Sequence, residues 1–226
     1  ENIDIVWTAM DWATVKKYYD VTEISISVQY DDLIKELNIY NGGTYFNFRE
    51  KLSEEAFSET AYYDSIISNY FNKFTKNKFP KKKTISMNLI EKLRYGENPH
   101  QESAIYSIQK NLNLKQIHGK KLSYNNYNDI FSALIISKSL PKNIGTVIVK
   151  HTNPCGVSAL RDQLNSYQSA LACDPVSAFG AIVSCNYRIK KKLAIELNKI
   201  FLEVVIANGF EKDALKILKR KKKLRL

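Results

Sequence analysis

The chain has 226 residues, of which 44% are apolar and 25% charged, and its formal charge is +11 at pH 7. This composition is typical of a globular protein with one or two domains, and no apolar run approaches the roughly eighteen residues of a membrane-spanning helix. The chain begins at Glu1 without a basic and apolar leader, so we predict no signal peptide and expect it to be part of a longer chain.

Cysteine usage and charge narrow the class of protein further. Cys155, Cys173 and Cys185 are odd in number and form no CxxC pair, which argues against a disulfide framework or zinc cluster and favours a reducing cytoplasm. The lysine-rich runs lack the interleaved aromatic residues of a stacking platform for bases. We expect these runs to be solvated surface, with neither nucleic acid nor membrane as a partner. A nucleic-acid-binding protein is the alternative, and the positive charge is the one feature that favours it.

The N-terminal region predicts a mixture of short strands and helices. Residues 9–17 are compatible with a short helix, and alternating apolar residues in Val21–Tyr30 predict a half-buried strand. Asp31 and Asp32 are expected to cap a helix over 33–37, which ends at a Gly-containing turn over 41–43.

A long amphipathic helix is predicted from about Phe48 to Phe74. Its apolar stripe, at helical spacing, is expected to pack against a domain or a partner and consists of Tyr63, Ile67, Tyr70 and Phe74. Residues 75–87 are basic, contain Pro80 and show no periodicity, so we predict a linker between domains at 1–74 and 88–226.

Three polar segments lie in the first part of the second domain. The loop 93–101 carries Arg94, Tyr95 and several amide and imidazole side chains, which makes it a plausible nucleotide contact. Further polar clusters follow at 116–120 and 123–129, and then a helix over 130–140 with Asp129 or Asn128 as its predicted N-cap.

The most informative stretch is a buried strand, 146–149, that ends in Lys150 and His151 and is followed by turn-forming residues at 153–156. Polar groups at the end of a buried strand are typical of ligand sites in α/β sheets. In a regular strand the two side chains would point to opposite faces, but a bulge or a strand end would let both reach one pocket. A strand end that merely carries Lys and His is an equally open reading of this stretch alone.

The remaining elements alternate, which predicts an α/β fold. We expect a helix over 159–172, a loop over 173–180, a strand over 181–185 and helices over 190–202 and 211–218. The second Cys of a zinc-deaminase signature is absent, so no metal is predicted. Because no Walker A sequence or GxGxxG motif is present, we expect any phosphate to be bound by Arg, Lys and loop amides.

Several blocks of the chain resemble one family, the bifunctional purine biosynthesis enzyme that joins IMP cyclohydrolase to AICAR transformylase. The blocks are Leu93–Gln101, Gln116–Lys120, Leu122–Asn126, Val147–Val157, Ala172–Gly180 and Ile200–Ala207. The resemblance implies the end of a methylglyoxal-synthase-like domain over 1–74, followed by the first part of a cytidine-deaminase-like transformylase domain without its zinc. It also implies a homodimer, for which the stripe on 63–74 is a candidate face.

The family transfers a formyl group from 10-formyltetrahydrofolate to the 5-amine of AICAR, giving FAICAR, and then cyclises FAICAR to IMP. By resemblance, His151 is the base that accepts the amine proton and Lys150 its electrostatic partner, whereas Arg94, Tyr95 and Asn126 hold the nucleotide. Packing for Tyr95 and a helix-entry turn for Asn126 are the alternatives.

Asp4 and Lys16 match cyclohydrolase positions. Val6-Trp7 replaces a Gly-Gly pair of the family, and Trp12 replaces an Arg. Because side chains block the close backbone approach that glycines allow, these departures argue against cyclisation by this chain. A non-catalytic or decayed fragment that at most binds AICAR is the alternative function.

Overall fold

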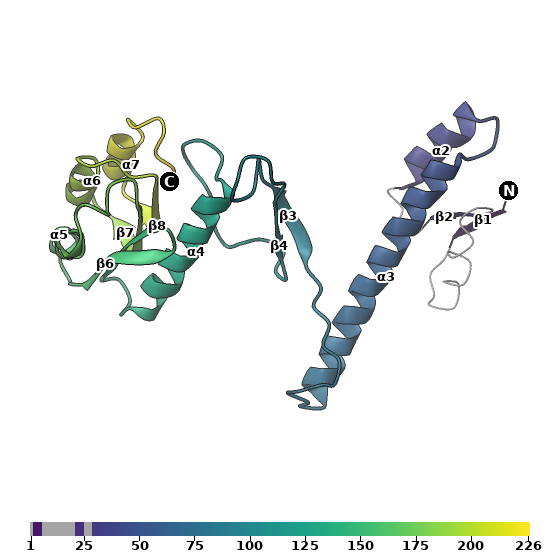
Figure 1. The fold of residues 1–226 in the computed structure, drawn as a ribbon, viewed down its shortest axis with the longest axis horizontal. Coiled ribbons are helices and arrows are strands. Elements are labelled where there is room, and N and C mark those ends of the chain that lie inside the picture. Colours follow the sequence, from purple (N-terminus) through teal and green to yellow (C-terminus); the bar gives the residue numbers. More distant parts are fainter. Residues whose placement is uncertain (1, 6–20, 25–28) are drawn as a thin grey trace. The chain divides into compact units, whose positions relative to one another are not determined.

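The computed structural model describes residues 2–5, 21–24 and 29–226, and the chain divides into two compact units, one up to Asn88 and one from Leu89 to Leu226. Figure 1 shows the elements of both units. The first unit contains β1 (Asn2–Ile5), β2 (Val21–Ile24), α2 (Tyr30–Ile39) and α3 (Phe46–Phe74). The second contains β4 (Ala104–Ser107), α4 (Tyr124–Ser139), β5 (Gly145–Lys150), β6 (Asn153–Ala159), α5 (Gln163–Cys173), β7 (Ile182–Ile189), α6 (Lys191–Leu197), β8 (Val204–Phe210) and α7 (Lys212–Leu218), with β3 (Asn88–Lys92) at the division.

The first unit pairs β1 with β2 in parallel and places α2 and α3 after them. The predicted strand was too long, because Tyr30 already begins α2. The predicted cap was also wrong: Gln29 occupies the N-cap of α2, and Asp31 and Asp32 lie in the first turn, where their charges favour the helix dipole. The helix ends as expected near Gly42, whose N–H donates to the Leu37 carbonyl at 2.7 Å.

Helix α3 confirms the predicted long helix, but most of its aromatic stripe faces solvent. Tyr63, Tyr70 and Phe74 are 63%, 61% and 72% exposed. The buried residues of α3 instead lie on another face, at Leu52, Ser53, Ala56 and Ser65. A partner for the stripe therefore stays a prediction.

The second unit is a three-layer α/β/α arrangement around a sheet in the order β6-β5-β7-β8. Strand β5 runs antiparallel to β6 and β7, and β7 runs parallel to β8. Successive residues of the central strands alternate between the faces. Ile148 and Val183 pack with α5, α6 and α7, whereas Val147 and Val149 pack with α4. Helix α4 and the other three helices accordingly lie on opposite sides of the sheet (Figure 1).

Strand β5 confirms the predicted buried strand, but the segment after it differs from the prediction. The chain turns at His151 and Thr152, two residues before the predicted turn at 153–156, and β6 then runs back beside β5. The register shifts between Ile148 and Val149, so that the partner strand contains a bulge at Pro154 and Cys155. Proline is tolerated there because β6 is an edge strand.

Because β6 extends to Ala159, the helix predicted to begin near 159 begins instead at Gln163, with Asp162 as its N-cap. Gly156 lets α5 pack against β6, because a Cβ at this position would overlap the carbonyl oxygen of Ala170. The predicted strand at 181–185 is confirmed and extends to Ile189, whereas β8 was not predicted as a strand.

Candidate functional site

A cleft of about 500 Å³ lies where β5 ends, and it contains most of the predicted transformylase residues. Tyr95, Asn126, Lys150 and His151 all line it. Because β5 ends at Lys150 and His151 starts the turn, the two adjacent side chains reach one cavity, as the strand-end hypothesis required. The remaining lining residues are Ser123, Asn125, Asp129, Phe179, Gly180, Glu203 and Arg225.

Lys150 is half-buried and tied to the loop between α5 and β7. Its Nζ donates a hydrogen bond to the carbonyl oxygen of Phe179 at 2.8 Å. Ser177 hydrogen bonds, together with the positive charge of Lys150, lower the pKa of the Asp174 carboxyl in the same loop. The ammonium retains two further N–H donors, so it can hold the loop and still present positive charge to a ligand.

Near Lys150, the thiol of Cys155 does not resemble a reactive cysteine. Burial raises its pKa, and the negative charge of Asp174 raises it further, while Lys150 acts in the opposite direction. A thiol with a raised pKa is a poor nucleophile at neutral pH, so Cys155 is better explained by the bulge that it occupies.

The first turn of α4 forms another wall of the cleft. Ser123 is the N-cap, and its side chain and that of Asn126 form a reciprocal capping box. The prediction of Asn128 or Asp129 as the cap was wrong, because the helix begins a turn earlier. The Nδ2 of Asn126 also donates to Glu203 Oε2 at 2.8 Å, so the buried Asn126 has a structural role beside any contact with substrate.

The loop 93–101 delivers Tyr95 but not Arg94 to the wall of the cleft. Arg94 is exposed, and its guanidinium carbon lies 5.5 Å from the centroid of the Tyr95 ring. The loop is held from within, since Ser103 Oγ donates to the Tyr95 carbonyl at 2.8 Å. Arg94 therefore lies beside Tyr95, a residue of the site, without lining the cleft itself.

The polar cluster 116–120 pairs with the last described residues of the chain. The Ile117 N–H donates to the Leu226 carbonyl at 2.7 Å, and the Leu226 N–H donates to the His118 carbonyl at 3.2 Å. Gly119 is required beside this pairing, because a Cβ would overlap the backbone at Leu224. The cluster therefore fastens residues 224–226 beside β8.

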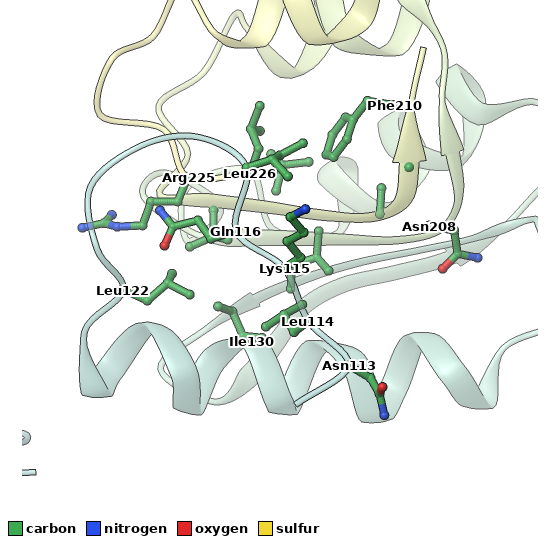
Figure 2. A pocket seen from close by; sticks show the side chains of 16 residues that line it. Asn113, Leu114, Lys115, Gln116, Leu122, Ile130, Asn208, Phe210, Arg225 and Leu226 are labelled. Atoms are coloured by element: carbon green, nitrogen blue, oxygen red, sulfur yellow. The ribbon is translucent and has the colours of Figure 1, made fainter. Parts of the chain in front are cut away.

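A second pocket, of about 240 Å³, lies at this outer edge of the sheet (Figure 2). Its labelled apolar side chains, among them Leu114, Leu122, Ile130 and Leu226, converge on one hollow. The ionisable side chains along it are Lys115 and Arg225 alone among the described residues that line it. Amide side chains such as Asn113 and Gln116 also line it, but its described lining contains no carboxylate or imidazole that could act as a base, and we therefore assign the chemistry to the cleft at β5.

Three residues that line the cleft were not predicted as site residues from the sequence: Asp129, Glu203 and Arg225. Glu203 lies inside the block 200–207 that carried the resemblance, so a signal for it existed. Arg225 sits in a basic segment without local distinction, and Asp129 was assigned to a helix cap.

The predicted cyclohydrolase residues can be followed only in part. Asp4 is in β1, where its backbone is opposite Glu23 of β2. Lys16 lies outside the described residues, as do Val6, Trp7 and Trp12. In the described part of the chain, no group of three or more His, Cys, Asp or Glu residues could hold a metal ion. Within the same ranges, no helix has both the length and the apolarity needed to cross a membrane.

Comparison with known proteins connects the whole second unit and most of the first to one family. The family model described as "AICARFT/IMPCHase bienzyme" matches residues 14–226. The chain is 40% identical over 231 residues to the bifunctional purine biosynthesis protein PurH of Listeria monocytogenes serotype 4a (strain HCC23). It is 43% identical over 230 residues to the protein of that name from Thermoanaerobacter sp. (strain X514). Each alignment covers 100% of this chain but 45% of the relative, so the chain spans less than half the length of these relatives.

Proposed function

Because the chain belongs to the AICARFT/IMPCHase bienzyme family, we propose that its second unit supplies the AICAR-binding and proton-transfer part of a formyl transferase of purine biosynthesis. The reaction moves a formyl group from 10-formyltetrahydrofolate to the 5-amine of AICAR and gives FAICAR. The observation that carries the proposal is the joint position of Lys150, His151, Tyr95 and Asn126 in one cleft.

The chemistry assigns distinct tasks to Lys150 and His151. The AICAR amine is a poor nucleophile because its lone pair is delocalised into the imidazole and carboxamide groups. As its nitrogen bonds to the formyl carbon, His151 accepts a proton from that nitrogen. The ammonium of Lys150 stabilises the negative charge that develops on the formyl oxygen. Collapse of the intermediate breaks the bond between the formyl carbon and the folate N10, which takes up the proton held by the His151 imidazolium, and FAICAR and tetrahydrofolate are released.

The walls of the cleft suit a ribonucleotide. Tyr95 presents an aromatic ring and hydroxyl, and Asn125 and Asn126 add amides. Arg94, beside Tyr95, supplies a positive charge suited to a phosphate. We further propose, from the family, a cytoplasmic homodimer that uses no metal. Cyclisation of FAICAR to IMP is proposed for the longer family members and not for this chain, given Val6-Trp7 and Trp12.

A binding-only function is the second candidate, and it is favoured by the exposure of His151 in this structure. A base acts most effectively when water is excluded from the reacting groups, and an exposed imidazole lacks that protection. In that case the chain would hold AICAR without formylating it.

Calorimetric titration with AICAR, followed by a formyl-transfer assay, separates these possibilities. We expect saturable binding that Arg94→Ala weakens by roughly 10- to 100-fold, since hydrogen bonds to charged groups contribute about 1.5–3 kcal/mol. His151→Ala should retain binding but reduce turnover by about 100-fold or more. Arg161→Ala alters an exposed residue outside the cleft and serves as a control. Binding without turnover in the unmodified chain would favour the second candidate, and no binding by a folded chain would refute both.

A further inference from the structure

The turn between β5 and β6 has a backbone conformation that its residues do not favour. His151 and Thr152 have φ values of 52° and 63°, both in the left-handed region. Non-glycine residues adopt this region uncommonly, and a β-branched residue such as Thr is particularly disfavoured. Two-residue hairpin turns of this kind usually contain Asn, Asp or Gly. The His151–Thr152 turn therefore requires support from its surroundings.

Some of that support comes from within the turn. Thr152 Oγ1 and Asn153 Nδ2 both donate to the carbonyl oxygen of His151, at 2.7 and 2.8 Å. These bonds fix the carbonyl, but they connect residues that would move together if the turn rotated as a unit. A contact with another element is needed to set the turn relative to the cleft.

Asp129 provides that contact. Its Oδ1 accepts a hydrogen bond from the Thr152 N–H at 2.6 Å, across 23 residues of sequence. The carboxylate is half-buried and carried by the second turn of α4, whose start is fixed by the Ser123–Asn126 capping box. Helix α4 also packs on β5, so Asp129 joins the turn to the rigid body of the unit.

We propose that Asp129 is a positioning residue for His151: its carboxylate holds the strained His151–Thr152 turn so that the imidazole faces the cleft. The inference rests on the proposed formyl transfer for its functional meaning, but the clamp itself can be tested without turnover. Asp129 acts here through a hydrogen bond to the backbone, and its negative charge as such is not the agent.

The test compares Asp129→Ala with Asp129→Asn, because the amide oxygen of Asn can still accept the Thr152 N–H whereas Ala cannot. NMR measures hydrogen exchange at the Thr152 amide and the shift of the His151 ring protons on addition of AICAR. In Asp129→Ala we expect amide exchange on the order of 10-fold faster and a diminished ring response. The formyl-transfer kcat should fall about 10- to 100-fold, with the KM for AICAR changed less than about 3-fold. Asp129→Asn should retain most of each property.

A second variant keeps the test valid if Asp129→Ala is unstable. Glycine adopts positive φ readily, so Thr152→Gly in the Asp129→Ala background should restore part of the ring response and of kcat. Unchanged exchange and ring response in Asp129→Ala would overturn the proposal, as would an Asp129→Asn variant as impaired as Asp129→Ala, since charge would then be the cause. Absence of turnover in the unmodified chain would count against formyl transfer, while the NMR comparison would still decide the clamp.

Discussion

The side chain of Asn126 donates a hydrogen bond to Glu203 Oε2 at 2.8 Å and thereby joins the first turn of α4 to the residue preceding β8. The carboxylate of Glu203 also lies 3.8 Å from the guanidinium of Arg225. All three residues line the cleft, so this contact sets the distance between two of its walls. Asn126 thus shapes the site through the fold, whether or not it also touches the nucleotide.

We predict that Asn126→Ala destabilises the chain by about 1–3 kcal/mol, because it removes both the capping-box acceptor for Ser123 and the hydrogen-bond donor to Glu203. Urea unfolding measures this loss, and AICAR titration of the folded variant should show weaker binding. Asn125→Ala changes an exposed neighbour that also lines the cleft, and it should leave stability within about 0.5 kcal/mol. Equal stability of the Asn126→Ala and unmodified chains would show that the hydrogen bonds of the Asn126 side chain do not stabilise the fold.

Tyr127 gives the second unit a predictable sensitivity to alkaline pH. Its hydroxyl donates to Glu91 at 3.0 Å, and burial, with the Glu91 carboxylate, raises its pKa to about 12. The unfolded value is about 10, so the folded state retains the proton longer. Stability from this group is intact below pH 10 and is lost as pH rises from about 10 to about 12.

Tyr127→Phe isolates that effect. Between pH 9 and pH 11, the unmodified chain should lose roughly 1 kcal/mol more unfolding free energy than the variant, since Phe has no proton to release. Urea titrations at several pH values measure the difference. Parallel pH profiles for the two chains would mean that the Tyr127 hydroxyl titrates alike in the folded and unfolded states.

Gly156 is required by packing and not by backbone conformation. A Cβ at this position would overlap the Ala170 carbonyl oxygen, which belongs to helix backbone and cannot rotate away. Gly156→Ala should therefore cost about 3 kcal/mol or more, at the upper end of overpacking effects. Val157→Ala, at an adjacent position that is 37% exposed, should cost less than about 1 kcal/mol in the same thermal or urea unfolding experiment. A mild effect at Gly156 would show that α5 can shift away from β6.

The sequence predicted elements best where one local signal dominates. The β-branched run before Lys150 is buried and forms β5, and the apolar spacing up to Phe74 forms α3. It failed where several residues could serve the same local purpose. Ser123 and Asp129 are both good N-caps, and only the reciprocal bonds with Asn126 and the contact of Asp129 with Thr152 decide between them.

Contacts between distant parts of the sequence also decide where the turn between β5 and β6 lies. Asn153, Pro154 and Gly156 have higher turn propensity than His151 and Thr152, yet the latter pair forms the turn. Pairing of β6 with β5 and the clamp by Asp129 override local preference, and no local pattern reveals contacts made over 23 residues of sequence. The end of a buried strand indicated that Lys150 and His151 could share a pocket, and the family resemblance supplied their proposed roles, whereas Glu203 and Arg225 reach the cleft only through the tertiary fold.

Substitution of Lys150 tests the proposal that Lys150 stabilises the oxyanion while His151 accepts the proton. Lys150→Met removes the ammonium but keeps a long flexible side chain at the end of β5. If Lys150 stabilises the oxyanion of the transition state, kcat should fall by about 100- to 1000-fold while the affinity for AICAR changes far less. The Asp174 pKa, which the charge of Lys150 helps to lower, should rise in the variant, and NMR titration of its carboxyl measures this change.

The Met variant also loses the hydrogen bond from Lys150 to the Phe179 carbonyl. Lys150→Gln, which can still donate to that carbonyl, controls for this loss of loop anchoring. A Gln variant with nearly full turnover would mean that Lys150 serves to hold the loop. The electrostatic role would then have to be assigned to Arg225, the other Lys or Arg residue among the described residues that line the cleft.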